Sequence, residues 1–112
     1  MRPDGSYING RLGAELAIEQ GKDAARHVGL AMLASLRRAL GSLDRVTRVV
    51  KLLGMVNATP EFQDHPAVIN GCSELFADIW GPERGVGARS AVGMTSLPHG
   101  IAVEIEGIFE IS

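Results

Sequence analysis

The sequence has only one cysteine, Cys72, and it has no long apolar segment. A single cysteine cannot close a disulfide within the chain. The polar start, residues 1–6, has none of the apolar core that a signal peptide needs, and no apolar run approaches the roughly 20 residues that span a bilayer. We therefore expect a soluble protein in a reducing compartment, the cytoplasm, with no membrane partner.

The sequence also has no excess of positive charge. It contains 11 Lys and Arg against 13 Asp and Glu, giving a net charge of -2, and the basic residues are scattered. Proteins that bind nucleic acids usually carry a clustered positive field, so we expect no nucleic-acid partner. His27 has no cysteine or second histidine at metal-ligand spacing, and we expect neither a metal nor another cofactor.

What the sequence does contain is the composition of a folded domain. Hydrophobic residues make up 46% and charged residues 21% of the 112 residues, which is typical of globular proteins. The length allows one domain and lies near the size at which partner subunits often help to stabilise the fold. We therefore expect a single domain that forms a homo-oligomer.

Two helices are predicted from the spacing of apolar residues. The first runs over Ile18–Leu40 and stops at Gly41; its apolar stripe is Ala25, Val28, Met32, Leu36 and Leu40. The second runs from about His65 to Trp80, with Pro66 in the first turn, and ends at Gly81 and Pro82. Arg26, Arg37 and Arg38 on the first helix are interpreted as ordinary solvated surface charges.

Strands are predicted in the remaining apolar stretches. The β-branched stretch from Asp44 to Asn57 predicts a central strand, in which Thr47 and Lys51 would share a face with Val49 and Leu53. Residues 88–94 and 101–110 each alternate with period two around a Pro-His-Gly turn. This pattern predicts a strand, a turn and a strand that pair with each other as a hairpin.

This order of elements predicts an α+β domain in which two helices cover one face of a mixed sheet. The other face of such an apolar sheet would be left in water, and packing against copies of the same chain would cover it.

The last two predicted strands carry charges among apolar residues. Arg89 lies in one strand, and Glu104 and Glu106 lie on a common face of the other. A charge in an apolar setting needs a partner or a ligand, which suggests a functional site. A cross-strand ion pair on a solvated face is the other interpretation of Arg89 and Glu104. We interpret Glu106 as a structural ion-pair partner, with a second acid as the alternative.

Three motifs in the last third of the chain resemble the C-terminal signature of a known family. They are Ala88-Arg89-Ser90-Ala91-Val92-Gly93, Leu97-Pro98-His99-Gly100 and Val103-Glu104-Ile105-Glu106-Gly107-Ile108. The family is RidA/YjgF, also called the endoribonuclease L-PSP family, with a chorismate-mutase-like fold. The resemblance extends from about Leu12 onward, and it is closest to a poorly characterised branch that has the phrase Asn70-Gly71.

The resemblance implies a homotrimer with three clefts between subunits. It implies a deaminase that hydrolyses reactive enamines and imines, such as 2-aminoacrylate, to 2-keto acids and ammonia. Arg89 matches the arginine that holds the substrate carboxylate, a task suited to a planar guanidinium. Glu104 matches the acid that positions or activates the attacking water, and would be the catalytic residue. Asn70 matches a substrate-binding asparagine near the cleft mouth.

The sequence departs from the family pattern at two places. Ala91 stands where many members have a cysteine, so any role of that thiol is absent. The family's first two strands, with a Ser-Gly-Gln segment and a tyrosine that line the cleft, have no counterpart in the motifs found. We therefore expect residues 1–112 to form a single RidA-like domain that lacks these strands.

Two other functions are compatible with the same residues. One is a non-catalytic trimeric protein that binds small carboxylate metabolites in its intersubunit clefts. The other is a ribonuclease, as the second family name suggests, but the chain lacks the basic field and the His and Lys cluster expected for RNA cleavage.

Overall fold

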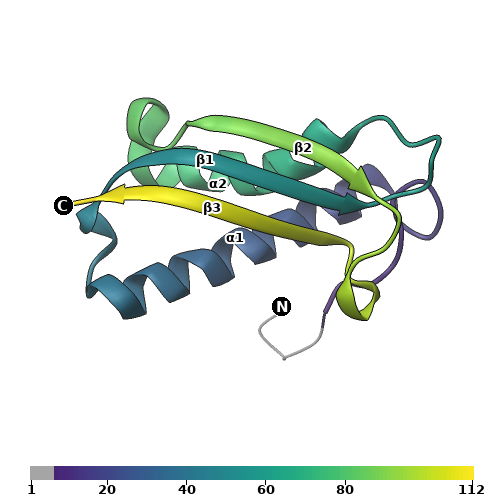
Figure 1. Ribbon diagram of the computed structural model, residues 1–112, viewed down its shortest axis with the longest axis horizontal. Helices are drawn as coiled ribbons and strands as arrows, with labels where there is room; N and C mark the ends of the chain where they lie inside the picture. The colour runs from purple at the N-terminus through teal and green to yellow at the C-terminus, as the bar shows by residue number, and fades with distance from the viewer. Residues whose placement is uncertain (1–6) are drawn as a thin grey trace.

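Two helices and three strands make up the fold, which a computed structural model describes for residues 7–112 (Figure 1). The elements are α1 (Ile18–Leu40), β1 (Val46–Asn57), α2 (His65–Arg84), β2 (Ala88–Met94) and β3 (Val103–Ile111), with short 3-10 turns at Leu43–Arg45 and Pro98–Gly100. This order confirms the predicted α+β class. Helix α1 has the predicted bounds, and Gly41 ends it in the left-handed conformation at φ 84°.

The sheet has the strand order β2-β1-β3, with β2 parallel and β3 antiparallel to β1. The prediction of a central strand is confirmed. The prediction that the last two strands lie beside each other is wrong, because β1 lies between them. Residues 95–102 cross the C-terminal end of β1, where the Asn57 amide donates to the Ala102 carbonyl at 2.9 Å and the Ala58 amide donates to the Met94 carbonyl at 3.3 Å.

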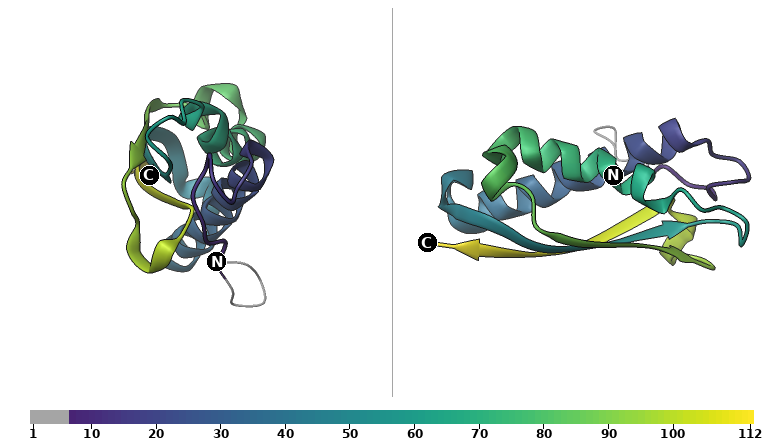
Figure 2. Two further views of the ribbon diagram at one scale, coloured as in Figure 1. Left: turned by 90° about the vertical axis from the view of Figure 1, so that its right-hand side faces the viewer. Right: turned by 90° about the horizontal axis from the view of Figure 1, so that it is seen from above.

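Both helices lie on the same side of the sheet, as predicted (Figure 2). The core between the layers includes Leu33, Val49, Leu52, Val68, Ile69, Phe76 and Val103. The two helices approach so closely at Gly71 that a Cβ there would lie 1.9 Å from the carbonyl oxygen of Lys22. Only glycine permits this approach, so the pairing of α1 with α2 depends on that residue.

Helix α2 is longer than predicted. Gly81 adopts φ 86°, and the chain bends there and makes one further helical turn to Arg84. Pro82 fits because it stands at the start of this turn, where its missing amide hydrogen is not needed. The Arg84 guanidinium donates to the Val46 carbonyl and to the Thr47 carbonyl, the latter at 3.4 Å, so the extra turn ties α2 to the start of β1.

The second face of the sheet is not covered by any element of residues 7–112 (Figure 2). We call it the open face. Strand register and alternation place on it the side chains of Lys51, Leu53, Met55, Ser90, Val92, Met94, Glu104, Glu106 and Ile108. Val49 is not among them: the β1–β3 register shifts between Val49 and Lys51, and Val49 is 1% exposed in the core, contrary to the prediction.

Neither helix within residues 7–112 combines the length and the apolar character needed to cross a lipid bilayer.

Candidate functional site

Arg89 and Asn70, two of the predicted site residues, are in direct contact. Arg89 lies near the start of β2, opposite Leu52, so its side chain leaves the sheet on the helix side. Its Nη1 atom donates to Asn70 Oδ1 at 2.6 Å and to Ser73 Oγ at 3.1 Å. Asn70 and Ser73 are three residues apart and therefore lie on the same surface of α2. Helix α2 thus holds the arginine in one orientation, and we call Arg89, Asn70 and Ser73 the Arg89 cluster.

The charge of Arg89 is not neutralised by the described part of the chain. Its two hydrogen-bond partners are uncharged, and the ion pairs found within residues 7–112 do not include it. A guanidinium is always protonated in proteins and has five N–H donors, of which the two acceptors use only the Nη1 group. The Nε and Nη2 groups are therefore available to bind two oxygens of one carboxylate.

A cavity of about 340 Å³ lies beside the guanidinium. Its floor and walls come from Leu52, Asn70, Ser73 and residues 85–87, which form the link between α2 and β2. Ser73 was not among the site residues predicted from the sequence. The signal that could have identified it is its spacing of three residues from Asn70 on one helix, which places both side chains next to the same neighbour.

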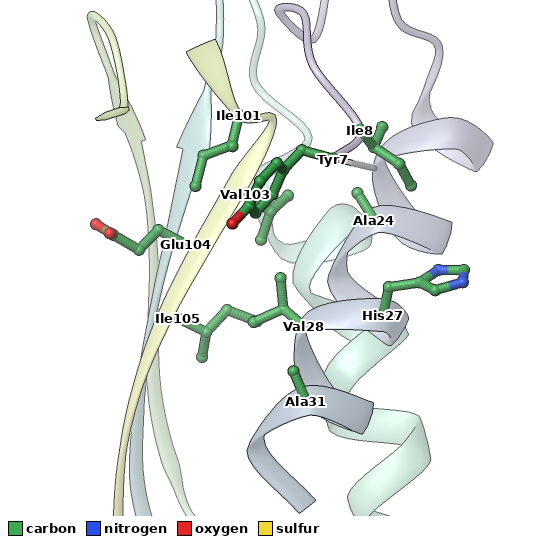
Figure 3. Close-up of a pocket in the computed structure, with 10 residues that line it drawn as sticks. All are labelled: Tyr7, Ile8, Ala24, His27, Val28, Ala31, Ile101, Val103, Glu104 and Ile105. Atoms are coloured by element: carbon green, nitrogen blue, oxygen red, sulfur yellow. The ribbon is translucent and has the colours of Figure 1, made fainter. Parts of the chain in front are cut away.

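Glu104 lies away from this cluster. It is opposite Met55 on β3, so its side chain belongs to the open face, and its carboxylate projects away from α1 while Val103 and Ile105 face the helix (Figure 3). Strand spacing and rise place Glu104 about 14 Å from Arg89 between Cα atoms. The structure therefore does not form the cross-strand ion pair considered from the sequence, and Arg89 and Glu104 do not share a site within one chain.

Glu106 shares the open face with Glu104, as the alternation predicted. It is opposite Leu53, two residues along β1 from the partner of Glu104. Glu104 is half-buried and Glu106 is exposed, and neither carboxylate has a cationic partner in the described residues. Two carboxylates on one face therefore remain available to a neighbouring molecule.

A second hollow, of about 190 Å³, lies between α1 and β3 (Figure 3). Its walls are mostly apolar and include Ile8, Val28 and Ile105, and Tyr7 lies at its edge. The His27 ring points away from it, toward Asp23. This hollow has the character of incomplete packing along β3, and the Glu104 carboxylate points away from it (Figure 3).

No cysteine takes part in the Arg89 cluster. Ala91, two residues beyond Arg89, has only a methyl group. Cys72 is completely buried in α2, and burial raises the pKa of its thiol to about 12. A buried thiol that stays protonated is a poor nucleophile, so Cys72 has a packing role.

Within residues 7–112, no three His, Cys, Asp or Glu side chains are grouped as metal ligands would be.

Comparison with known proteins agrees with this fold. The sequence profile described as "YjgF/chorismate mutase-like, putative endoribonuclease" matches residues 4–100. The chain therefore belongs to the YjgF/chorismate-mutase-like family, which confirms the resemblance to RidA/YjgF proteins.

Several relatives are similar over nearly the whole chain. Protein TCP17 of Trypanosoma cruzi is 44% identical over 108 residues, which are 96% of this chain and 68% of that protein. The crystal structure of Atu1372, a protein of unknown function from Agrobacterium tumefaciens, is 39% identical with a TM-score of 0.96 and covers 100% of this chain and 71% of that one. A "putative endoribonuclease" from Shewanella oneidensis is 27% identical with a TM-score of 0.88, over 93% and 68% of the two chains.

Proposed function

We propose that this protein binds a small 2-imino acid through its carboxylate and hydrolyses it to a 2-keto acid and ammonia. The observation that supports this proposal is the Arg89 guanidinium, which Asn70 and Ser73 orient and which no carboxylate of the described chain neutralises. Two N–H groups of a rigid guanidinium match the two oxygens of a carboxylate, so such an arginine selects for a planar anionic group.

In the proposed reaction, water adds to the carbon of the C=N bond. The iminium form is already electrophilic, so the protein has to hold the substrate and take a proton from the attacking water. Glu104 is proposed as that base. The protonated Glu104 then returns this proton to the amino group of the carbinolamine. The C–N bond breaks with loss of ammonia while the hydroxyl gives up its proton and the C=O bond forms, so one imine and one water give one keto acid and one ammonia.

Because Arg89 and Glu104 lie on opposite sides of the sheet, the proposed reaction needs two chains. We propose a homotrimer in which the open face of one copy packs near the β2 edge of another, bringing Glu104 of the first to Arg89 of the second. The exposed Val92, Met94 and Ile108 on the open face, at 40%, 38% and 60% exposure, favour such packing.

The test is the rate of 2-keto acid release from a 2-imino acid that an amino-acid oxidase generates in the same solution. We expect the wild-type protein to accelerate release and the Arg89→Gln variant to lose at least tenfold, because the carboxylate loses its cation. Arg26→Gln, a change at an exposed position on α1, is the matched control and should keep the full rate. Full activity of Arg89→Gln would contradict the proposal.

A second candidate is a trimeric protein that binds small carboxylate metabolites without turnover. It is favoured by the separation of Glu104 from Arg89 within the chain and by the methyl group of Ala91 in place of a thiol. It predicts that pyruvate raises the melting temperature of the wild type but not of Arg89→Gln, and that neither protein releases keto acid.

A further inference from the structure

A third cavity, which is polar and has a volume of about 310 Å³, lies at the C-terminal ends of the parallel strands β1 and β2. The loop before α1 and the start of α2 are at the same end of the molecule (Figure 1). The cavity is lined by Arg11 from the loop, Thr59 after β1, His65 of α2, and Gly93 and Thr95 at the end of β2. It is separate from the Arg89 cluster, because Gly93 is four residues, or about 13 Å, further along β2.

Arg11 is fixed at this cavity by the main chain. The neighbouring Leu12 exchanges hydrogen bonds with the continuation of β1, its amide donating to the Asn57 carbonyl at 2.8 Å and its carbonyl accepting from the Thr59 amide at 3.0 Å. The Arg11 Nη2 group donates to the Ala58 carbonyl at 3.0 Å. The guanidinium is thus held in place before any ligand arrives, which lowers the entropy cost of binding.

The Arg11 Nε atom is buried and has no hydrogen-bond partner within residues 7–112. A buried donor on a charged group is costly unless an acceptor satisfies it, and the great majority of such groups are satisfied. Arg11, which carries this unsatisfied donor, is also a lining residue of the cavity.

The His65 ring is positioned as firmly as Arg11. It packs edge-on against Phe62, with ring centroids 5.2 Å apart. Its Nε2 atom sits so close to β2 that a Cβ at Gly93 would lie 2.6 Å from it, so glycine at this position makes room for the ring. Arg11, His65 and the two threonines Thr59 and Thr95 therefore line one cavity.

The charge around the cavity favours an anion. No Asp or Glu is among its lining residues; Glu61 and Asp64 line a neighbouring hollow instead. Glu15 accepts a hydrogen bond from the Arg11 main-chain amide, and the ion pairs found within residues 7–112 do not include the Arg11 guanidinium. We propose that this cavity is a second anion site, which binds the carboxylate or phosphate group of a small metabolite through Arg11, with His65 and the threonine hydroxyls as additional hydrogen-bond partners.

The test is calorimetric titration of the whole protein with two probes, inorganic phosphate and acetate, at constant ionic strength. We expect saturable binding of at least one probe, and the probe that binds distinguishes a phosphate from a carboxylate site. Arg11→Gln should weaken binding at least tenfold, because glutamine can still donate to the Ala58 carbonyl but has no charge. Arg26→Gln should bind like the wild type. Binding that is lost in Arg89→Gln but kept in Arg11→Gln would belong to the proposed imino-acid site and would count against this one, which separates the two proposals.

A second measurement on the wild type avoids any effect of the substitution on folding. The NMR resonance of the Arg11 Nε–H group should shift on addition of the probe that binds, because an anion then lies beside the same guanidinium. Absence of saturable binding by both probes would overturn the proposal. Equal affinity of wild type and Arg11→Gln, or an Arg11 Nε–H resonance that stays fixed while a probe binds, would overturn it as well.

Discussion

The two faces of the sheet differ in what their side chains contact. On the helix-covered face, Val49, Leu52 and Val56 are no more than 4% exposed and pack against α1 and α2. On the open face, Val92, Met94 and Ile108 are each more than a third exposed and share the face with the carboxylates of Glu104 and Glu106. The same strands thus contribute a buried core on one side, and solvent-exposed apolar side chains and unpaired carboxylates among the described residues on the other.

This difference separates the side chains that stabilise the single chain from those that are available for contacts with other copies. Burial of the helix-covered face stabilises the single chain, since apolar area removed from water is the main favourable term in folding. The open face contributes little to the folded chain. Substitutions on the helix-covered face should therefore lower the stability of the single chain, and substitutions on the open face should change its assembly with other copies.

Phe76→Ala should have the largest effect. Phe76 is 0% exposed and packs against Trp80 and Phe109, with ring centroids 5.4 and 5.9 Å apart. We expect a loss of about 3–5 kcal/mol in the free energy of unfolding, measured by urea denaturation, because the side chain leaves a cavity that its neighbours cannot fill. A loss below about 1 kcal/mol would mean that the core does not pack as described.

The buried thiol of Cys72 should make stability depend on pH. Burial raises the pKa of this thiol from 9.0 to about 12 in the folded chain. Above pH 9 the unfolded chain releases this proton and the folded chain keeps it, so the free energy of unfolding falls as pH rises from 9 toward 12. The expected loss at pH 10 is about 1 kcal/mol.

Cys72→Ala is the matched variant for this pH dependence. It removes the titrating group, so urea denaturation at pH 8 and pH 10 should show a smaller decrease for the variant than for the wild type. Equal decreases would show that the thiol does not contribute to the slope.

Ile108→Ser on the open face should have the smallest effect on the stability of the single chain, within about 0.5 kcal/mol, since the side chain is 60% exposed. If copies pack through the open face, the same change should lower the assembled fraction in sedimentation experiments at constant protein concentration. Ile79→Ser, at an exposed position on α2, is the control on the helix layer and should leave the assembled fraction unchanged. Equal assembly of all three proteins would place the contact elsewhere.

Local patterns in the sequence were enough to predict most elements. The spacing of apolar residues defined α1, and the glycine after it defined its end, because both depend only on neighbouring residues. The β-branched stretch defined β1 for the same reason. Motif resemblance identified the family and gave both Arg89 and Asn70 as site residues, although it gave no reason to include Ser73.

The arrangement of the last two strands depended on tertiary structure. The sequence predicted both a central strand and an apparent hairpin, and the structure satisfies the first by inserting β1 between β2 and β3. Alternation in a strand gives the face of each residue only relative to its own strand, so it could not reveal that Arg89 and Glu104 face opposite sides. The register shifts in β1 moved Val49 to the core for a similar reason.

The sequence by itself determined the element types, the family and the chemical identity of the candidate site residues, because these follow from local propensity and from motifs. Only the tertiary structure decided which of them meet. It joined Arg89 to α2, placed Glu104 on the open face, and brought Arg11 to the same cavity as His65. Contacts between residues distant in sequence depend on strand order and register, which are set by packing of the whole chain.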